Sequence, residues 1–165
     1  MDNLNEMKAV IIGAMGALTG LWGWFGWLVV GWIICMLLDW ITGSAAAAKD
    51  GEWNSAAARA GIWHKAGMIV VVMVAAAADL LLSIVISQLP VMFEYPGMIC
   101  PVVLAWYIVT ELGSITENAV AMGAPVPSWL IHLLDMGKDA VDNAGNKLTG
   151  KDEKTGGGNN EVLKD

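Results

Sequence analysis

The chain has 165 residues, enough for one domain, and 56% of them are apolar, a fraction too high for an ordinary water-soluble domain. The formal net charge is −7, which excludes nucleic acid as an expected partner because a phosphate backbone binds basic surfaces. Nine Trp residues are a high count, and Trp favours the boundary between a bilayer and water. These features predict an all-α integral membrane protein whose surroundings are the lipid bilayer.

The first apolar region, residues 9–47, is too long for one straight helix across a bilayer core of about 30 Å. Within it, the segment GLWGWFGW (20–27) combines glycines, which weaken helices, with interfacial Trp residues. We therefore expect a break there. Residues 9–20 form a short helix that lies in the interface or enters the membrane part-way, and residues 24–47 form the first full span. A fourth, partial crossing by residues 9–20 stays open.

Small residues recur at a helical spacing before this break. Gly16 and Gly20 form a GxxxG pair, and Gly13 forms a similar pair with Ala17. This spacing lets two membrane helices approach closely, although glycines are common in membrane helices in any case. We treat Gly13, Gly16 and Gly20 as candidates for helix packing, within the chain or in a homo-oligomer.

Two further apolar regions, residues 62–89 and 97–121, are each long enough to span, and neither has a Pro in its middle. The second region contains Asp79, and the third contains Glu111 and Glu117. The prediction is therefore three transmembrane helices.

The connections between the spans predict their direction. The first, about 48–61, contains Lys49 and Arg59, whereas the second, about 88–96, contains Glu94 and no Lys or Arg. Positive residues mark the cytoplasmic side, so the first connection is cytoplasmic and the second external. The N-terminus then lies outside. The C-terminus lies in the cytoplasm, in agreement with the five lysines that follow the third span.

Beyond the third span, Ser128 follows Pro125-Val126-Pro127 and is suited to begin a helix. Apolar residues recur at helical spacing up to Val141, with Asp and Lys between them, which predicts an amphipathic helix for the membrane surface or a partner helix. Residues 143–165 are rich in Gly, Asn, Lys and Asp, a composition that predicts a disordered tail. Residues 1–142 thus form the membrane domain.

Each predicted span carries an acid: Asp39, Asp79, and Glu111 with Glu117. A carboxylate near the bilayer centre costs a few kcal/mol, so it usually faces protein or water. At 100° per residue, the polar side chains of the third span gather within an arc of about 120°. They are Tyr107, Thr110, Glu111, Ser114, Glu117 and Asn118. Asp79 and Ser83 form a thinner polar stripe on the second span.

Three interpretations of these polar faces stay open. They hydrogen-bond between helices without any aqueous path, they line a hole when several copies assemble, or Asp79 and Glu111 relay protons or ions. We expect Arg59, His64 and Lys65 to lie near the cytoplasmic interface, about 20 Å along the helix from Asp79.

The sequence has no pattern typical of an enzyme. His64 and His132 are isolated, and we find no Gly-rich phosphate loop, nucleophile elbow or HExxH motif. We therefore expect no catalytic activity, no cofactor and no bound metal.

Three segments resemble those of the phage lysis and toxin-secretion holins. The first is LDWITG (38–43), followed by an Ala run, and the second is YIVTELGSITEN (107–118). The third, MGAPVP (122–127), is similar to a Gly-x-Pro-x-Pro link in that family and leads into Trp129-Leu130. The order and spacing of these pieces match over about residues 25–135.

The resemblance implies a phage-encoded or prophage-derived protein of the bacterial inner membrane. Such a protein forms homo-oligomers and opens lesions at a set time, so that an endolysin reaches the cell wall without needing direct contact. An antiholin is a possible further partner. Two alternatives stay open: a channel that secretes a toxin or another protein without lysis, and an antiholin or membrane anchor that regulates a holin.

Overall fold

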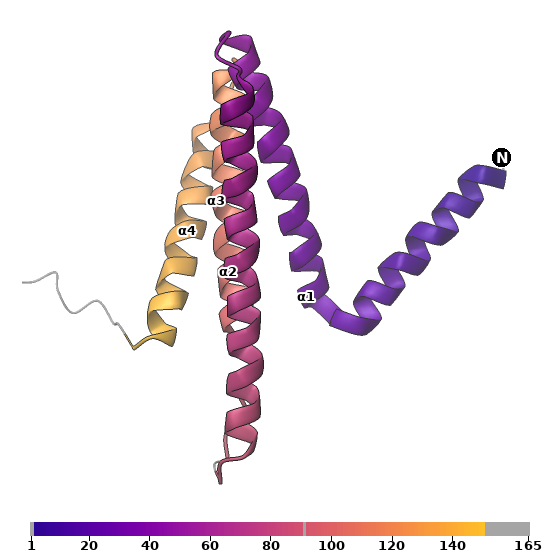
Figure 1. Ribbon diagram of the computed structural model, residues 1–165, viewed down its shortest axis with the longest axis vertical. Coiled ribbons are helices and arrows are strands. Elements are labelled where there is room, and N and C mark those ends of the chain that lie inside the picture. Colours follow the sequence, from indigo (N-terminus) through magenta and orange to yellow (C-terminus); the bar gives the residue numbers. More distant parts are fainter. Residues whose placement is uncertain (1, 91, 151–165) are drawn as a thin grey trace, which may run out of the picture.

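The computed structural model describes residues 2–90 and 92–150 and contains four helices in this part of the chain (Figure 1). They are α1 (Asp2–Lys49), α2 (Ser55–Ser87), α3 (Ile99–Ala121) and α4 (Ser128–Leu148). Three helical segments are long and apolar enough to cross a membrane: Gly23–Lys49 of α1, all of α2, and all of α3. The predicted all-α membrane class and the three spans are therefore confirmed.

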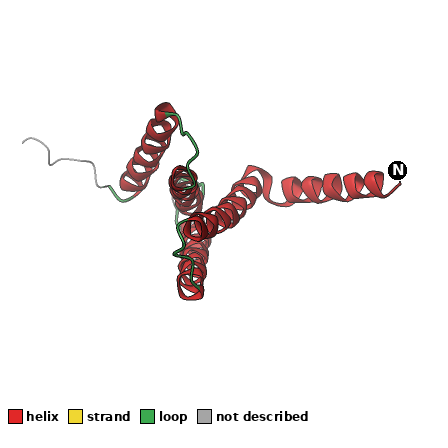
Figure 2. Cartoon of the chain, turned by 90° about the horizontal axis from the view of Figure 1, so that it is seen from above, coloured by secondary structure: helices red, strands yellow, loops and turns green. Residues whose placement is uncertain are grey.

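The predicted break in the first apolar region lies at Gly23, where φ is 57° and ψ is −142°. A side chain with a Cβ rarely adopts this backbone conformation, so glycine permits the kink. Thr19 and Trp27 bridge the kink, with Nε1 of Trp27 donating to Oγ1 of Thr19 at 3.0 Å. The helix before the kink is longer than expected, because it begins at Asp2 and not at residue 9. This arm (residues 2–22) leads away from the other helices (Figures 1 and 2).

α3 is the central helix, because it packs against α1, α2 and α4. Its buried residues Cys100 and Leu104 meet Trp32 and Met36 of α1 and Met68 of α2 in a small core. The other apolar side chains of the spans are largely exposed on the single chain. Exposure of this kind suits a lipid environment, in which apolar burial between helices gives little free energy.

α4 corrects the expected end of the amphipathic helix. It continues to Leu148, so the first residues of the predicted tail are helical. Asn and Gly are poor helix formers, but Gly145 lies against Val102 of α3, and this packing outweighs the local preference. The remainder of the predicted tail, 151–165, lies outside the described residues.

Candidate functional site

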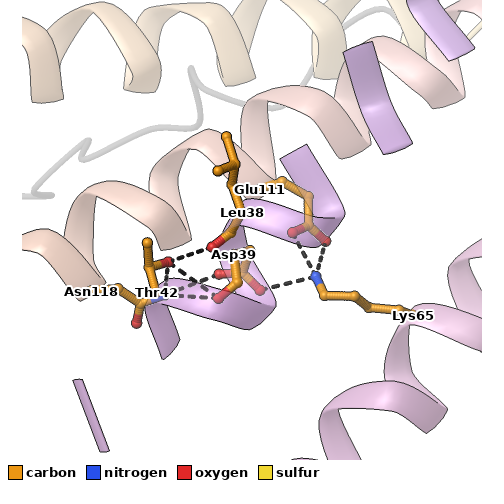
Figure 3. Close-up of polar contacts among 6 residues, drawn as sticks. All are labelled: Leu38, Asp39, Thr42, Lys65, Glu111 and Asn118. Carbon is orange, nitrogen blue, oxygen red and sulfur yellow. Dashed lines mark hydrogen bonds and ion pairs between the residues drawn. The ribbon is translucent and has the colours of Figure 1, made fainter. Parts of the chain in front are cut away.

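A cluster of charged side chains joins the three spans (Figure 3). Nζ of Lys65 in α2 lies 2.9 Å from Oδ2 of Asp39 in α1. The same atom lies 2.6 Å and 2.8 Å from the two carboxylate oxygens of Glu111 in α3. One ammonium group thus binds one carboxylate from each of the two other spans.

Asn118 extends this cluster toward the C-terminal ends of α1 and α3. Its Nδ2 donates to Oδ1 of Asp39 at 3.1 Å and lies 3.1 Å from Oγ1 of Thr42. Thr42 in turn donates to the carbonyl oxygen of Leu38 at 2.8 Å. Gly43 lies beside Asn118, because a Cβ on this glycine would be in van der Waals contact with Nδ2 of Asn118 at 3.4 Å.

Asp39, Lys65 and Glu111 each lie ten residues from one end of their helix. Asp39 is ten residues before Lys49, Lys65 is ten residues after Ser55, and Glu111 is ten residues before Ala121. Ten residues of helix span about 15 Å, so the cluster lies within the membrane-spanning part of the bundle.

Burial makes these ion pairs costly to break. The exposed fractions of the side chains are 15% for Lys65, 21% for Asp39 and 5% for Glu111. Removing one partner of a buried pair leaves an uncompensated charge and typically costs about 3–5 kcal/mol. The cluster also holds two carboxylates for one ammonium group, so Lys65 is the member whose loss leaves the most unbalanced charge.

The interfacial position expected for Lys65 is therefore wrong. The short connection between α1 and α2 makes the two helices antiparallel, which places Lys65 beside Asp39 at the same depth. The apolar region beginning at residue 62 placed Lys65 near the start of its span, whereas α2 begins seven residues earlier, at Ser55. His64, next in sequence to Lys65, is exposed on the single chain, and its interfacial position stays a prediction.

Asp79 forms a separate polar contact at the opposite end of α3. Its carboxylate accepts hydrogen bonds from the backbone N–H of Ile99 at 3.0 Å and of Cys100 at 2.7 Å. These groups belong to the first turn of α3, where a negative charge is favourable. The hydroxyl of Tyr95 also donates to Asp79 at 2.6 Å. Burial and this hydrogen bond raise the pKa of Tyr95 above its ordinary value.

Asp79 and Glu111 are held by different parts of α3. Asp79 binds at Ile99, and Glu111 is twelve residues further along the helix, about 18 Å away. Asp79 accepts hydrogen bonds from Tyr95 and from two backbone N–H groups, whereas Glu111 binds Lys65, so the two carboxylates share no partner.

The other predicted polar residues differ in their surroundings. Tyr107 stacks on Trp32 with ring centroids 6.0 Å apart. Oγ1 of Thr110 donates to its own helix, at the carbonyl of Trp106, and Ser114 lines a hollow of about 560 Å³ between α2 and α3. Ser83 and Glu117 are exposed on the single chain.

The arm has no packing partner at its predicted glycines. A Cβ added to Gly13, Gly16 or Gly20 would meet no atom within 4 Å. A packing role for these glycines therefore stays a prediction that concerns contact between copies of the chain.

Residues 16–139 match the family model of the bacteriophage holin family. The chain belongs to this family. The matched region includes LDWITG, which contains Asp39, Thr42 and Gly43, and YIVTELGSITEN, which contains Glu111 and Asn118. Side chains from these two segments thus meet one another in space.

The chain is also similar over most of its length to three curated relatives. An uncharacterized protein of Halalkalibacterium halodurans is 34% identical over 79% of this chain and 90% of its own length. An uncharacterized protein of Clostridium perfringens is 28% identical over 78% of this chain and 87% of its own. An uncharacterized 14.9 kDa protein of the same species, named by its place in the nagH 3′ region, is 28% identical over 81% and 95%. No solved structure matches this holin significantly.

Proposed function

We propose that this holin-family chain assembles as a homo-oligomer in the inner membrane of a bacterial host and permeabilises it at a set time. An endolysin then passes the membrane and degrades the cell wall, without necessarily touching the holin. The first connection and the link between α3 and α4 lie in the cytoplasm, and residues 88–98 lie outside. The process needs no catalysis by this chain, because the lesion itself gives the endolysin access.

The observation that best supports this proposal is the ion-paired cluster of Asp39, Lys65 and Glu111. It joins the three spans into one unit, and two of its members, Asp39 and Glu111, lie in the segments LDWITG and YIVTELGSITEN, which resemble those of phage holins. The largely exposed apolar surface of that unit is available to lipid or to further copies. Three spans are too few to surround a wide water-filled path, so a lesion must form between copies.

Expression in a bacterium tests the proposal. The chain is produced alone and together with an endolysin, and membrane potential, growth and optical density are followed. We expect sudden loss of potential and growth arrest with the chain alone, and rapid lysis only when the endolysin is present. An endolysin produced without the chain is the control.

Two other results would overturn the proposal. Harmless accumulation in the membrane would favour an antiholin or an anchor. Release of a co-produced protein from cells that continue to grow would favour a secretion channel.

A further inference from the structure

α4 lies alongside the third span. A Cβ on Gly137 would lie 3.6 Å from Val109 of α3, and one on Gly145 would lie 4.0 Å from Val102. As α4 advances, its contacts thus move back toward the beginning of α3, and the two helices are antiparallel neighbours (Figure 1). Since α3 spans the membrane, these contacts place α4 at membrane depth.

The length of α4 fits a crossing. Its 21 residues extend about 31 Å, close to the hydrocarbon thickness of about 30 Å. The contact at Val102 lies within the first turn of α3, and Nε1 of Trp106 in the next turn donates to Oδ1 of Asp142 at 2.7 Å. α4 therefore follows α3 almost to the external end of that span.

Most residues of α4 divide into three faces; the exceptions include exposed Ile131, which lies within the arc of the polar face, and Lys147, which lies at the end of the exposed apolar face. The face toward α3 is half-buried and apolar, and it consists of Leu130, Leu134, Gly137, Val141, Ala144 and Gly145. A second face is apolar and exposed, and it consists of Trp129, Leu133, Met136 and Ala140. The third face, here called the polar stripe, consists of His132, Asp135, Lys138, Asp139, Asp142 and Asn146. At 100° per residue the polar stripe occupies an arc of about 120°.

Lipid can cover only one of the two exposed faces. The apolar face with Trp129 and Met136 suits acyl chains, whereas each charged group of the polar stripe costs a few kcal/mol in hydrocarbon. The stripe therefore needs water beside it at membrane depth. A single copy cannot enclose water, so several copies must surround it together.

We propose that α4 is a fourth membrane-crossing helix and that its polar stripe lines the water-filled lesion in an assembly of copies of this chain. The lining role rests on the proposed permeabilising function, whereas the crossing does not. The C-terminal tail then lies outside the cell, opposite to the side that its lysines alone predict.

The sidedness of two single cysteines tests the crossing. In a Cys35→Ala/Cys100→Ala background, Ala124→Cys places a thiol before α4 and Asn159→Cys places one after it. An impermeant thiol reagent is added to spheroplasts whose membrane potential is still intact. We expect labelling from outside for Asn159→Cys alone. If both thiols, or neither, react from outside, α4 does not cross.

A matched pair of neighbouring positions tests the lining. Asp139→Cys lies in the polar stripe, and Ala140→Cys lies on the apolar exposed face. The protein is placed in a planar bilayer, and ion current is recorded before and after addition of a cationic methanethiosulfonate reagent. We expect the current to change roughly twofold or more for Asp139→Cys and to stay constant for Ala140→Cys. No change for Asp139→Cys, or an equal change for both, would overturn the lining.

These results separate the inference from the proposed function. If the wild-type chain never permeabilises a membrane, the proposed function and the lining fail together, but thiol sidedness still decides whether α4 crosses. If the chain permeabilises membranes while Ala124→Cys and Asn159→Cys stay on one side, the inference alone is wrong.

Discussion

Nζ of Lys65 lies 2.6 Å from Oε2 of Glu111, so an ion pair joins α2 to α3 at membrane depth. The same ammonium group also binds Asp39 of α1 at 2.9 Å. Apolar contacts between membrane helices discriminate poorly between alternative arrangements, because lipid is as apolar as the side chains. The ion pairs therefore specify which faces of the three spans meet.

Replacing Lys65 by Met should lower the free energy of unfolding by about 3–5 kcal/mol, because two carboxylates lose their shared counter-charge. Thermal unfolding in detergent micelles measures the loss. Lys49→Met is the matched control: Lys49 is exposed and donates to the carbonyl of Ala121 at 3.0 Å, a contact worth about 1 kcal/mol or less. Equal stability of the two variants would show that the cluster does not hold the spans together.

Glu111→Leu should shift the time of lysis or abolish lysis, since it removes the link between α3 and Lys65. Glu111→Gln retains the shape of the side chain and part of its hydrogen bonding, so its effect should be smaller. Optical density of cells that co-express an endolysin gives the lysis time. Lysis of the Glu111→Leu strain on the wild-type schedule would contradict a role for Glu111 in the lesion or its opening.

The contribution of Tyr95 to stability should depend on pH. Its pKa is raised in the folded chain by burial and by the bond to Asp79, so this contribution is present below the ordinary Tyr pKa of about 10. The stabilising contribution of Tyr95 is lost as pH rises through the raised pKa that Tyr95 has in the folded chain. Wild type should exceed Tyr95→Phe by about 1 kcal/mol at neutral pH.

Unfolding of wild type and Tyr95→Phe in micelles, compared from pH 7 to 11, checks this expectation. The difference between the two should be constant up to about pH 9 and should shrink above pH 10. A difference that grows with pH would contradict the assigned hydrogen bond.

Gly23→Ala should disturb the kink, because a Cβ at φ 57° and ψ −142° costs about 1–3 kcal/mol. The two parts of α1 should then approach one continuous helix. Electron paramagnetic resonance distances between spin labels at Val10 and Ile41, in the background without native cysteines, report the change. Gly31→Ala is the control, since Gly31 has no positive φ and its surroundings are open. Equal distances in both variants would mean that Gly23 does not set the kink.

Replacing both Gly16 and Gly20 by Leu should reduce contact between copies of the arm, because large side chains prevent the close approach of two helices. Chemical crosslinking in membranes should yield fewer high-order bands than for the wild type. Val10→Leu on the same arm is the control, because Val10 is already large and exposed. An unchanged pattern of bands would leave the GxxxG pair without a packing role.

Local features of the sequence predicted much of the fold. The lengths of the apolar regions predicted three spans, and the glycines between Trp residues predicted the break that lies at Gly23. The LDWITG and YIVTELGSITEN segments indicated the family. These inferences succeed because hydropathy, glycine conformation and short motifs depend on neighbours in the chain.

Only the tertiary structure decided how the polar residues are paired. Lys65 binds residues that are 26 and 46 positions away, and this pairing depends on the mutual register of three antiparallel helices. The continuation of α4 to Leu148 and its position along α3 likewise depend on contacts such as Gly145 with Val102. Local preference opposes a helix at Asn143 and Gly145, whereas the packing of α4 against α3 favours it.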